Sequence, residues 1–408
     1  MNGRWSKLVK LSAALSMLLP LLTGCWDRLE IEDRAVVLGV SIDKAKGGGN
    51  TDDVTHYKGT MPAPQMGLIR VAVQIALPGR IPLGPGEGGG GATDPKQTVW
   101  VIDVVGYTLD DAFMKLQQQV SSRIFLGHLR VIIMSEEFAK GGIDNVNDYF
   151  RRNSEVRRMA WLMVSKGSAL ALLKAGPKLE RIPTLYLMSA LDEGINMGKF
   201  PRDYIGIFWS NASKKGEEGY LPYVALRKEQ NVEIMGLAYF RGSRMMGKTK
   251  PLQIGSFMAI KGANPAGYRV YVMLEGTKKM VMTTTTHRNT KWKPSIRDGK
   301  PHFAINIVLE VNIEEKMTRN FDLDDMSVVR QIQDIEAKKA EKFCAQLIRQ
   351  TQAAGSDIFG FGEYIRAKQP RYWNAAVKTK KGWQEAYKEA TFDIHAFVNV
   401  RRVGMKAN

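Results

Sequence analysis

The sequence predicts an α+β fold divided into more than one domain, with mixed β-sheets packed against helices. Apolar runs of strand length recur in both halves of the chain. Amphipathic helical segments alternate with these runs in the first half, whereas one long helical segment lies near the end of the second half. The chain has 408 residues, which is enough for two or three hydrophobic cores.

The first 24 residues have the composition of a lipoprotein signal peptide. Three basic side chains are followed by an apolar run over residues 11–22. That run is too short to cross a bilayer of about 30 Å as a permanent helix. It ends in the lipobox Leu22-Thr23-Gly24-Cys25. We therefore expect cleavage between Gly24 and Cys25, and attachment of lipid to the thiol of Cys25.

The segments after Cys25 are expected to form an N-terminal α/β domain over residues 25–195. Thr108 and Ser135 are suitable N-terminal caps for two of its expected helices. The expected strands are 35–43, 68–77, 98–105, 129–134 and 159–165. Four helices are expected. Two begin directly after Thr108 and Ser135, and two others cover residues 143–151 and 167–174.

Glycine, proline and charged residues dominate residues 196–230, which predicts a boundary and a small middle domain over 196–265. A strand at 232–240 is expected within it. The C-terminal domain, 266–408, is expected to be a sheet with one long helix. Its expected elements are strands between 268 and 311, a helix over 327–351 ended by Gly355, and a closing strand at 392–403. The predicted buried face of that helix includes Val329, Ile332, Ile335, Phe343, Leu347 and Ile348.

Charge and cysteine content restrict the function classes. The chain has 59 basic and 41 acidic residues, and removal of residues 1–24, with three basic residues and no acid, lowers its net charge from +18 to +15. Export excludes nucleic acid as the partner, so an anionic membrane surface or an acidic partner is expected. Cys344 has no second cysteine to pair with once Cys25 carries lipid, so no disulfide is expected. We expect it to be a packed core thiol.

Motifs that would indicate catalysis or cofactor binding are missing from the sequence. The five histidines are scattered, so no metal site is predicted, and no G-x-S-x-G turn occurs. Residues 84–89 fit G-x-G-x-x-G formally, but strands are expected on both sides of them. We interpret the glycine-rich stretch 84–91 as a flexible loop with an open role. No cofactor and no catalytic residue are predicted.

Arg151, Arg152, Arg157 and Arg158 form the densest basic cluster in the sequence. A cluster of this kind is typical of a solvated loop. It is also typical of a surface that binds lipid headgroups or an acidic partner. Both interpretations are compatible with the sequence.

Beyond the lipobox, the chain resembles the Ger(x)C spore germination lipoproteins, the C subunits of nutrient germinant receptors. The likeness covers nearly the whole chain after the signal peptide, in the family's order. It is carried by residues 24–33, 37–43, 126–137, 221–222, 235–240, 246–247 and 357–362, by Trp373 and Trp383, and by the closing strand to Gly404.

This resemblance implies a three-domain body anchored to the outer face of the spore inner membrane. It also implies membrane-embedded A and B subunits as partners, a requirement for nutrient-triggered germination, and no enzymatic activity. Two other classes stay open at this point. A solute-binding lipoprotein would need two similar α/β lobes, and a cell-wall hydrolase would need a cleft with two carboxylates.

Overall fold

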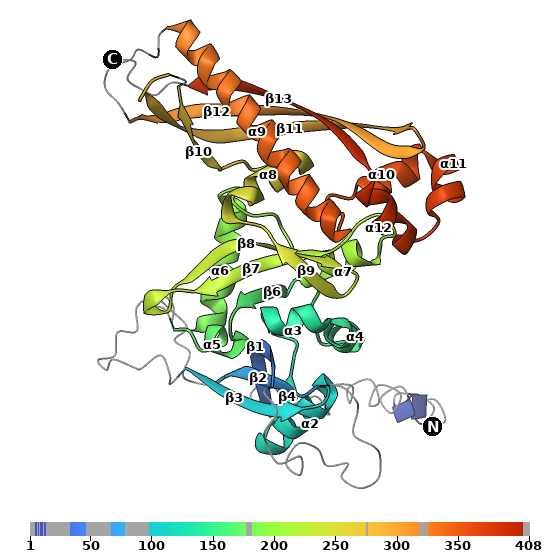
Figure 1. The fold of residues 1–408 in the computed structure, drawn as a ribbon. Coiled ribbons are helices and arrows are strands. Elements are labelled where there is room, and N and C mark those ends of the chain that lie inside the picture. Colours follow the sequence, from blue (N-terminus) through green and yellow to red (C-terminus); the bar gives the residue numbers. More distant parts are fainter. Residues whose placement is uncertain are drawn as a thin grey trace.

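The computed structural model describes residues 33–45, 67–77, 98–176, 182–274, 276–317 and 325–402, with Leu323 and scattered positions between residues 5 and 13. These residues form two mixed sheets covered by helices in a two-domain layout, which confirms the predicted α+β class (Figure 1). Gly24, Cys25 and the glycine-rich stretch 84–91 lie outside the described residues. No helix within the described ranges is long and apolar enough to cross a membrane.

The larger sheet has nine strands, in the order β3-β2-β1-β5-β6-β7-β8-β9, with β4 also pairing with β1. The pairs β1–β5, β5–β6 and β6–β7 are parallel, and the strands that flank them on both sides are antiparallel. The strands are β1 (Arg34–Lys44), β2 (Ile69–Ala76), β3 (Val99–Gly106), β4 (Arg123–Phe125), β5 (Val131–Ser135), β6 (Trp161–Lys166), β7 (Tyr220–Leu226), β8 (Val232–Arg241) and β9 (Arg244–Lys248).

Both faces of the central strands are buried. Ile132 and Met134 of β5 point into one core cluster, whereas Val131 and Ile133 point into the other, as the two-residue period of a strand requires. Helices α2 (Leu109–Gln119), α3 (Glu136–Gly141), α4 (Asp144–Arg152) and α7 (Ile205–Ser213) cover the first face. Helices α5 (Ala169–Leu173) and α6 (Pro183–Asn196) cover the second.

The predicted caps of α2 and α3 are confirmed. The Thr108 hydroxyl accepts a hydrogen bond from the backbone N–H of Asp111 at 3.1 Å, and Ser135 accepts one from Phe138 at 3.4 Å. Each bond satisfies a donor that the helix itself leaves open.

The first sheet continues beyond the expected boundary at residue 196. Strands β7, β8 and β9 extend it through the parallel pair β6–β7, so residues 196–265 carry no separate sheet. The stretch expected to be loop also contains α7 and β7. Helices α6 and α7 did not emerge from the sequence, because their apolar residues lie on several sides.

The smaller sheet has the order β10-β11-β12-β13, in which only β12 and β13 are parallel. The long helix α9 (Met326–Ala354) packs on it through Ile332, Leu347 and Ile348, and Gly355 ends the helix in the left-handed conformation, as predicted. The strands are β10 (Arg269–Met273), β11 (Met280–Arg297), β12 (Lys300–Lys316) and β13 (Thr391–Arg402).

The prediction that Phe343 is buried is wrong, because its side chain is 42% exposed. Its position in the helical period does place it on the inner side of α9, near Leu347. At that height, however, α9 faces a cavity rather than packed side chains. Cys344, one residue later, is buried as predicted.

Helix α8 (Pro251–Lys261) lies between the two sheets (Figure 1). It packs against β8 of the larger sheet, against β11 and β12 of the smaller one, and against α9. Since buried residues surround it, its sequence has no amphipathic period, and no helix was predicted there. The chain also forms α10 (Phe361–Lys368), α11 (Pro370–Tyr372), a π-helical turn (Trp373–Val377) and α12 (Lys380–Lys388).

Candidate functional site

The four arginines of the predicted basic cluster all lie on the protein surface, and we call them the basic surface. Arg151 and Arg152 end α4, whereas Arg157 and Arg158 follow in the segment that leads to β6. Arg152 pairs with Asp148 at 2.8 Å. The Arg151 guanidinium lies 5.2 Å from the centre of the Trp209 ring.

Arg157 and Arg158 form no ion pair with any described residue. They are followed by Met159, whose side chain is 71% exposed. An apolar side chain beside two unpaired cations is a composition that suits the interface between water and lipid headgroups.

The basic surface lies at the end of the larger sheet where β1 begins. Arg34, the first residue of β1, is in register with Arg123 of β4. Just after β4, the backbone N–H of Leu126 donates to the Glu155 carboxylate at 2.9 Å, which ties this end of the sheet to the segment between Arg152 and Arg157.

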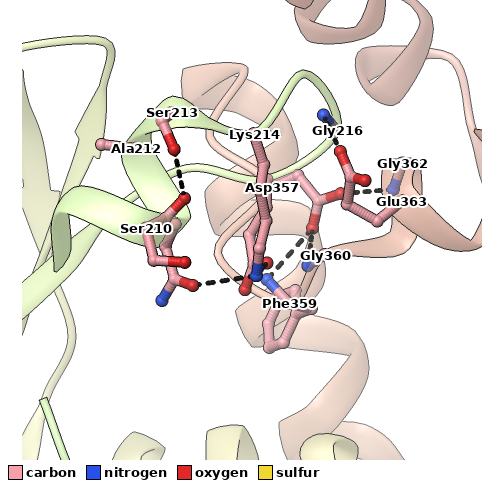
Figure 2. Close-up of polar contacts among 12 residues, drawn as sticks. Ser210, Ala212, Ser213, Lys214, Gly216, Asp357, Phe359, Gly360, Gly362 and Glu363 are labelled. Carbon is pink, nitrogen blue, oxygen red and sulfur yellow. Dashed lines mark hydrogen bonds and ion pairs between the residues drawn. The ribbon is translucent and has the colours of Figure 1, made fainter. Parts of the chain in front are cut away.

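A second candidate region is the junction between the two domains, where residues 214–218 meet residues 356–363 (Figure 2). Asp357 is its centre. One carboxylate oxygen accepts hydrogen bonds from the backbone N–H groups of Phe359 and Gly360, at 3.0 and 2.9 Å. The other accepts from Gly362 N–H and from the indole of Trp383, both at 2.9 Å. All four bonds are buried.

Backbone contacts across the junction leave no space for side chains at two glycines. A Cβ atom on Gly216 would lie 2.3 Å from the carbonyl carbon of Gly362. The N–H of Gly216 donates to the Glu363 carboxylate at 2.7 Å (Figure 2), and the Asp357 carbonyl accepts from Glu218 N–H at 2.7 Å. The two chain segments are therefore held in direct contact.

Two buried glutamates of the first domain pair with lysines on both sides of the junction. Lys214 and Lys261 lie 2.6 and 3.5 Å from the carboxylate oxygens of Glu217. Lys380, on α12 of the second domain, lies 3.1 Å from Glu218. Glu217 would keep one lysine if the other were lost, whereas loss of Lys380 would remove the lysine that pairs with the buried Glu218.

Burial also shifts the acidity of two carboxyl groups here. It raises the pKa of Asp357 to about 7, while its hydrogen bond from Gly362 acts in the opposite sense. Burial, followed by the charge of Glu217, raises the pKa of Asp203 well above its ordinary value. Neither oxygen of Asp203 has a hydrogen-bond partner among the described residues.

The arrangement at the junction suits mechanical connection rather than chemistry. No group of histidine, cysteine and acidic side chains in the described ranges could hold a metal ion. Burial raises the pKa of the Cys344 thiol to about 12, which removes its nucleophilic form at neutral pH. The sequence singled out residues 357–362 by resemblance, but their contact with residues 214–218 of the first domain emerges only from the structure.

Two family descriptions match this chain in sequence. The one described as "Spore germination protein N-terminal domain" matches residues 27–226, and "Spore germination B3/ GerAC like, C-terminal" matches residues 235–404. Among curated proteins, the putative spore germination protein YfkR of Bacillus subtilis (strain 168) is 27% identical, with 94% of each chain covered. Spore germination protein KC of the same strain is 26% identical, with 95% of this chain and 94% of its own length covered.

A solved structure shares the fold. The crystal structure of the GerBC protein superposes with a TM-score of 0.55, covering 82% of this chain and 94% of that one at 20% identity.

Proposed function

Because the chain belongs to the Ger(x)C family of spore germination proteins, which is non-enzymatic, we propose that it is the lipid-anchored subunit of a nutrient germinant receptor. One observation carries this proposal. The family match begins at residue 27, directly after the lipobox that ends in Cys25, and continues to residue 404. The sequence thus joins a lipid-attachment signal to an almost complete family body.

In this proposal, lipid on Cys25 holds the protein on the outer face of the spore inner membrane. Mass spectrometry of the native N-terminal peptide should find a lipid-modified cysteine after removal of residues 1–24. Cys25→Ala should leave the protein unprocessed or released from membranes. Cys344→Ala is the matched control, because Cys344 is buried and should not affect anchoring. Normal membrane attachment of Cys25→Ala would contradict the proposal.

The proposed partners are membrane-embedded A and B subunits. A pull-down of this protein from spore membranes should recover both, and deletion of either should lower its level or abolish its function in spores. The protein alone should confer no nutrient response. Germination restored by this protein in spores that lack both membrane subunits would overturn its role as a receptor subunit.

The basic surface is proposed to face the membrane. Cys25 precedes Arg34 by nine residues, and a fully extended segment of that length spans about 30 Å at most. Since β1 begins beside β4 and the segment tied to it through Glu155, lipid on Cys25 would keep the basic surface near anionic headgroups. Each basic residue close to such a surface contributes about 1 kcal/mol.

Vesicle co-sedimentation tests this orientation. Lipid-free protein should bind weakly to vesicles that contain anionic lipid and should not bind to neutral vesicles. The binding should be lost in high salt, because the Debye length falls from about 10 to about 3 Å. Arg157→Glu with Arg158→Glu should weaken binding without unfolding the domain. The matched control is Lys291→Glu with Lys293→Glu, an exposed pair on β11 of the other domain. Equal losses in both double variants would show that net charge, not this surface, is responsible.

The structure gives no support to the two alternative classes. A solute-binding lipoprotein would have two similar lobes, whereas the two sheets here differ in size and strand order. The cell-wall hydrolase does not agree with membership of a non-enzymatic family.

A further inference from the structure

A cavity of about 340 Å³ lies between α8, α9 and the strands β10 and β11. Most of its wall is hydrocarbon, which includes Ala259, Val270 and Ala340. Three large apolar side chains at its edge are exposed: Leu252, Tyr271 and Phe343. Their exposure is costly in water, so this edge is a place where an apolar ligand would gain contact area.

Arg288 of β11 borders this cavity and is only 2% exposed. Its Nη1 donates to the carbonyls of Ala263 and Pro265, at 3.0 and 3.4 Å. Its backbone N–H donates to the Asn264 side chain at 3.0 Å, so the guanidinium is held firmly by the loop after α8. Burial lowers the pKa of Arg288 to about 10, which still leaves it charged at neutral pH.

The second terminal nitrogen of Arg288, Nη2, has no hydrogen-bond partner among the described residues. No carboxylate within those ranges forms an ion pair with this guanidinium either. A buried cation without a counterion is unfavourable, and folded proteins satisfy such groups with a partner, a water or a ligand.

Glu336 of α9 borders the same cavity and is 3% exposed. Its Oε2 atom also has no hydrogen-bond partner within the described ranges, so it does not compensate Arg288. Burial raises the pKa of Glu336 to about 7, so at neutral pH a large share of it is protonated and can donate a hydrogen bond. Arg288 and Glu336 thus both border the cavity, and each has one buried polar atom without a partner among the described residues.

We propose that this cavity binds a small carboxylic acid with an apolar body, with its carboxylate on Arg288 and its body between α8, β10 and Phe343. A cavity at the lower end of the usual range for small-molecule sites suits a ligand of about ten non-hydrogen atoms. A monoanion fits better than a phosphate, since the apolar wall leaves few donors for a dianion's oxygens. This inference goes beyond the proposed receptor role and does not depend on it.

Entry requires the edge of the cavity to move, because Nη2 is shielded from solvent by its surroundings.

Three probes with the same phenylpropyl body test the proposal: 3-phenylpropanoate, 3-phenylpropan-1-ol and 3-phenylpropylamine. Binding to the mature lipidated protein in lipid nanodiscs is measured by ligand-observed NMR, with empty nanodiscs subtracted. The carboxylate should bind at least tenfold more tightly than the alcohol, and the amine should not bind. Equal affinities for the three probes, or no binding of the carboxylate at millimolar concentration, would overturn the proposal.

Variants distinguish the contribution of the Arg288 charge from that of the cavity volume. Arg288→Met should abolish the preference for the carboxylate over the alcohol, whereas Arg269→Met, an exposed arginine on the same cavity, should preserve it. Ala340→Leu, which fills the cavity and leaves both charges, should weaken all binding at least tenfold and keeps the test valid if Arg288→Met does not fold. Unchanged binding in Ala340→Leu would place the ligand elsewhere and contradict the proposal. Loss of the preference for the carboxylate over the alcohol in Arg269→Met would also contradict the proposal.

Discussion

Asp357 at the domain junction and Arg288 at the cavity are both buried ionisable groups, but they differ in how many of their polar atoms have hydrogen-bond partners. Asp357 accepts four hydrogen bonds, two on each carboxylate oxygen. Arg288 uses one terminal nitrogen and leaves the other without a partner among the described residues. One site is complete in itself and the other is not.

This difference separates a structural role from a binding role. A buried polar group with every bond made contributes to the conformation of the chain and has nothing left for a ligand. A buried donor left open in a well-packed domain lowers stability, which a ligand can restore. The predictions below test whether the two sites respond to change as this contrast requires.

The largest expected effect is at the junction. Asp357→Ala removes one carboxylate and leaves four buried donors without an acceptor, so the free energy of unfolding should fall by about 3 kcal/mol or more. Urea unfolding of the full chain would measure this change. Asp357→Asn keeps the shape and one acceptor oxygen, so its free energy of unfolding should lie between that of the unmodified protein and that of Asp357→Ala. A loss below about 1 kcal/mol in Asp357→Ala would mean that the junction does not depend on this carboxylate.

A pH-dependent effect is expected at the cavity. Glu336 has a pKa of about 7 in the folded protein against 4.5 for an unperturbed glutamate, so the folded state holds one more proton between these values. Its contribution to stability is therefore fully present below pH 4.5 and is lost as pH rises through 7, by up to about 3 kcal/mol. Thermal unfolding across this window should show a smaller pH slope in Glu336→Gln. An identical slope would argue against a buried, protonated Glu336.

The smallest expected effect is on the exposed edge of the cavity. Phe343→Ala should lower the free energy of unfolding by about 1 kcal/mol, since a half-exposed ring loses little burial. Leu347→Ala, one turn further along the inner side of α9, should cost about 2–5 kcal/mol because it is fully buried. Equal costs from equilibrium unfolding would show that Phe343 is packed and that no cavity separates α9 from β10.

The sequence was sufficient for elements whose signals are local. The strand at 35–43, the capped helix after Thr108 and the closing strand at 392–403 were all predicted and are all present. Their period and caps lie within a few residues of each other, so no distant contact is needed to recognise them. Helix α8 was missed for the opposite reason, since its contacts with both sheets and with α9 leave its sequence without the polar face that marks a helix.

Candidate sites followed the same division. The four arginines were predicted as a cluster from their closeness in sequence, and each of them is exposed. Nothing in the sequence brings Arg288 near Glu336, 48 positions further along, and their shared cavity depends on how α9 crosses the second sheet. Phe343 shows the same difference within one helix. The helical period placed it correctly on the inner side of α9, but α9 faces a cavity at that position, so the side chain is partly exposed.

By itself, the sequence determined the α+β class, the lipobox with Cys25, the family resemblance and most strands, because each depends on the order and spacing of nearby residues. The tertiary structure decided that β7, β8 and β9 extend the first sheet, that the Asp357 carbonyl and the Glu363 carboxylate link the two domains, and that Arg288 borders a cavity with an unpartnered nitrogen among the described residues. These features depend on contacts between segments far apart in the chain, and such contacts leave no periodic trace in the residues that make them.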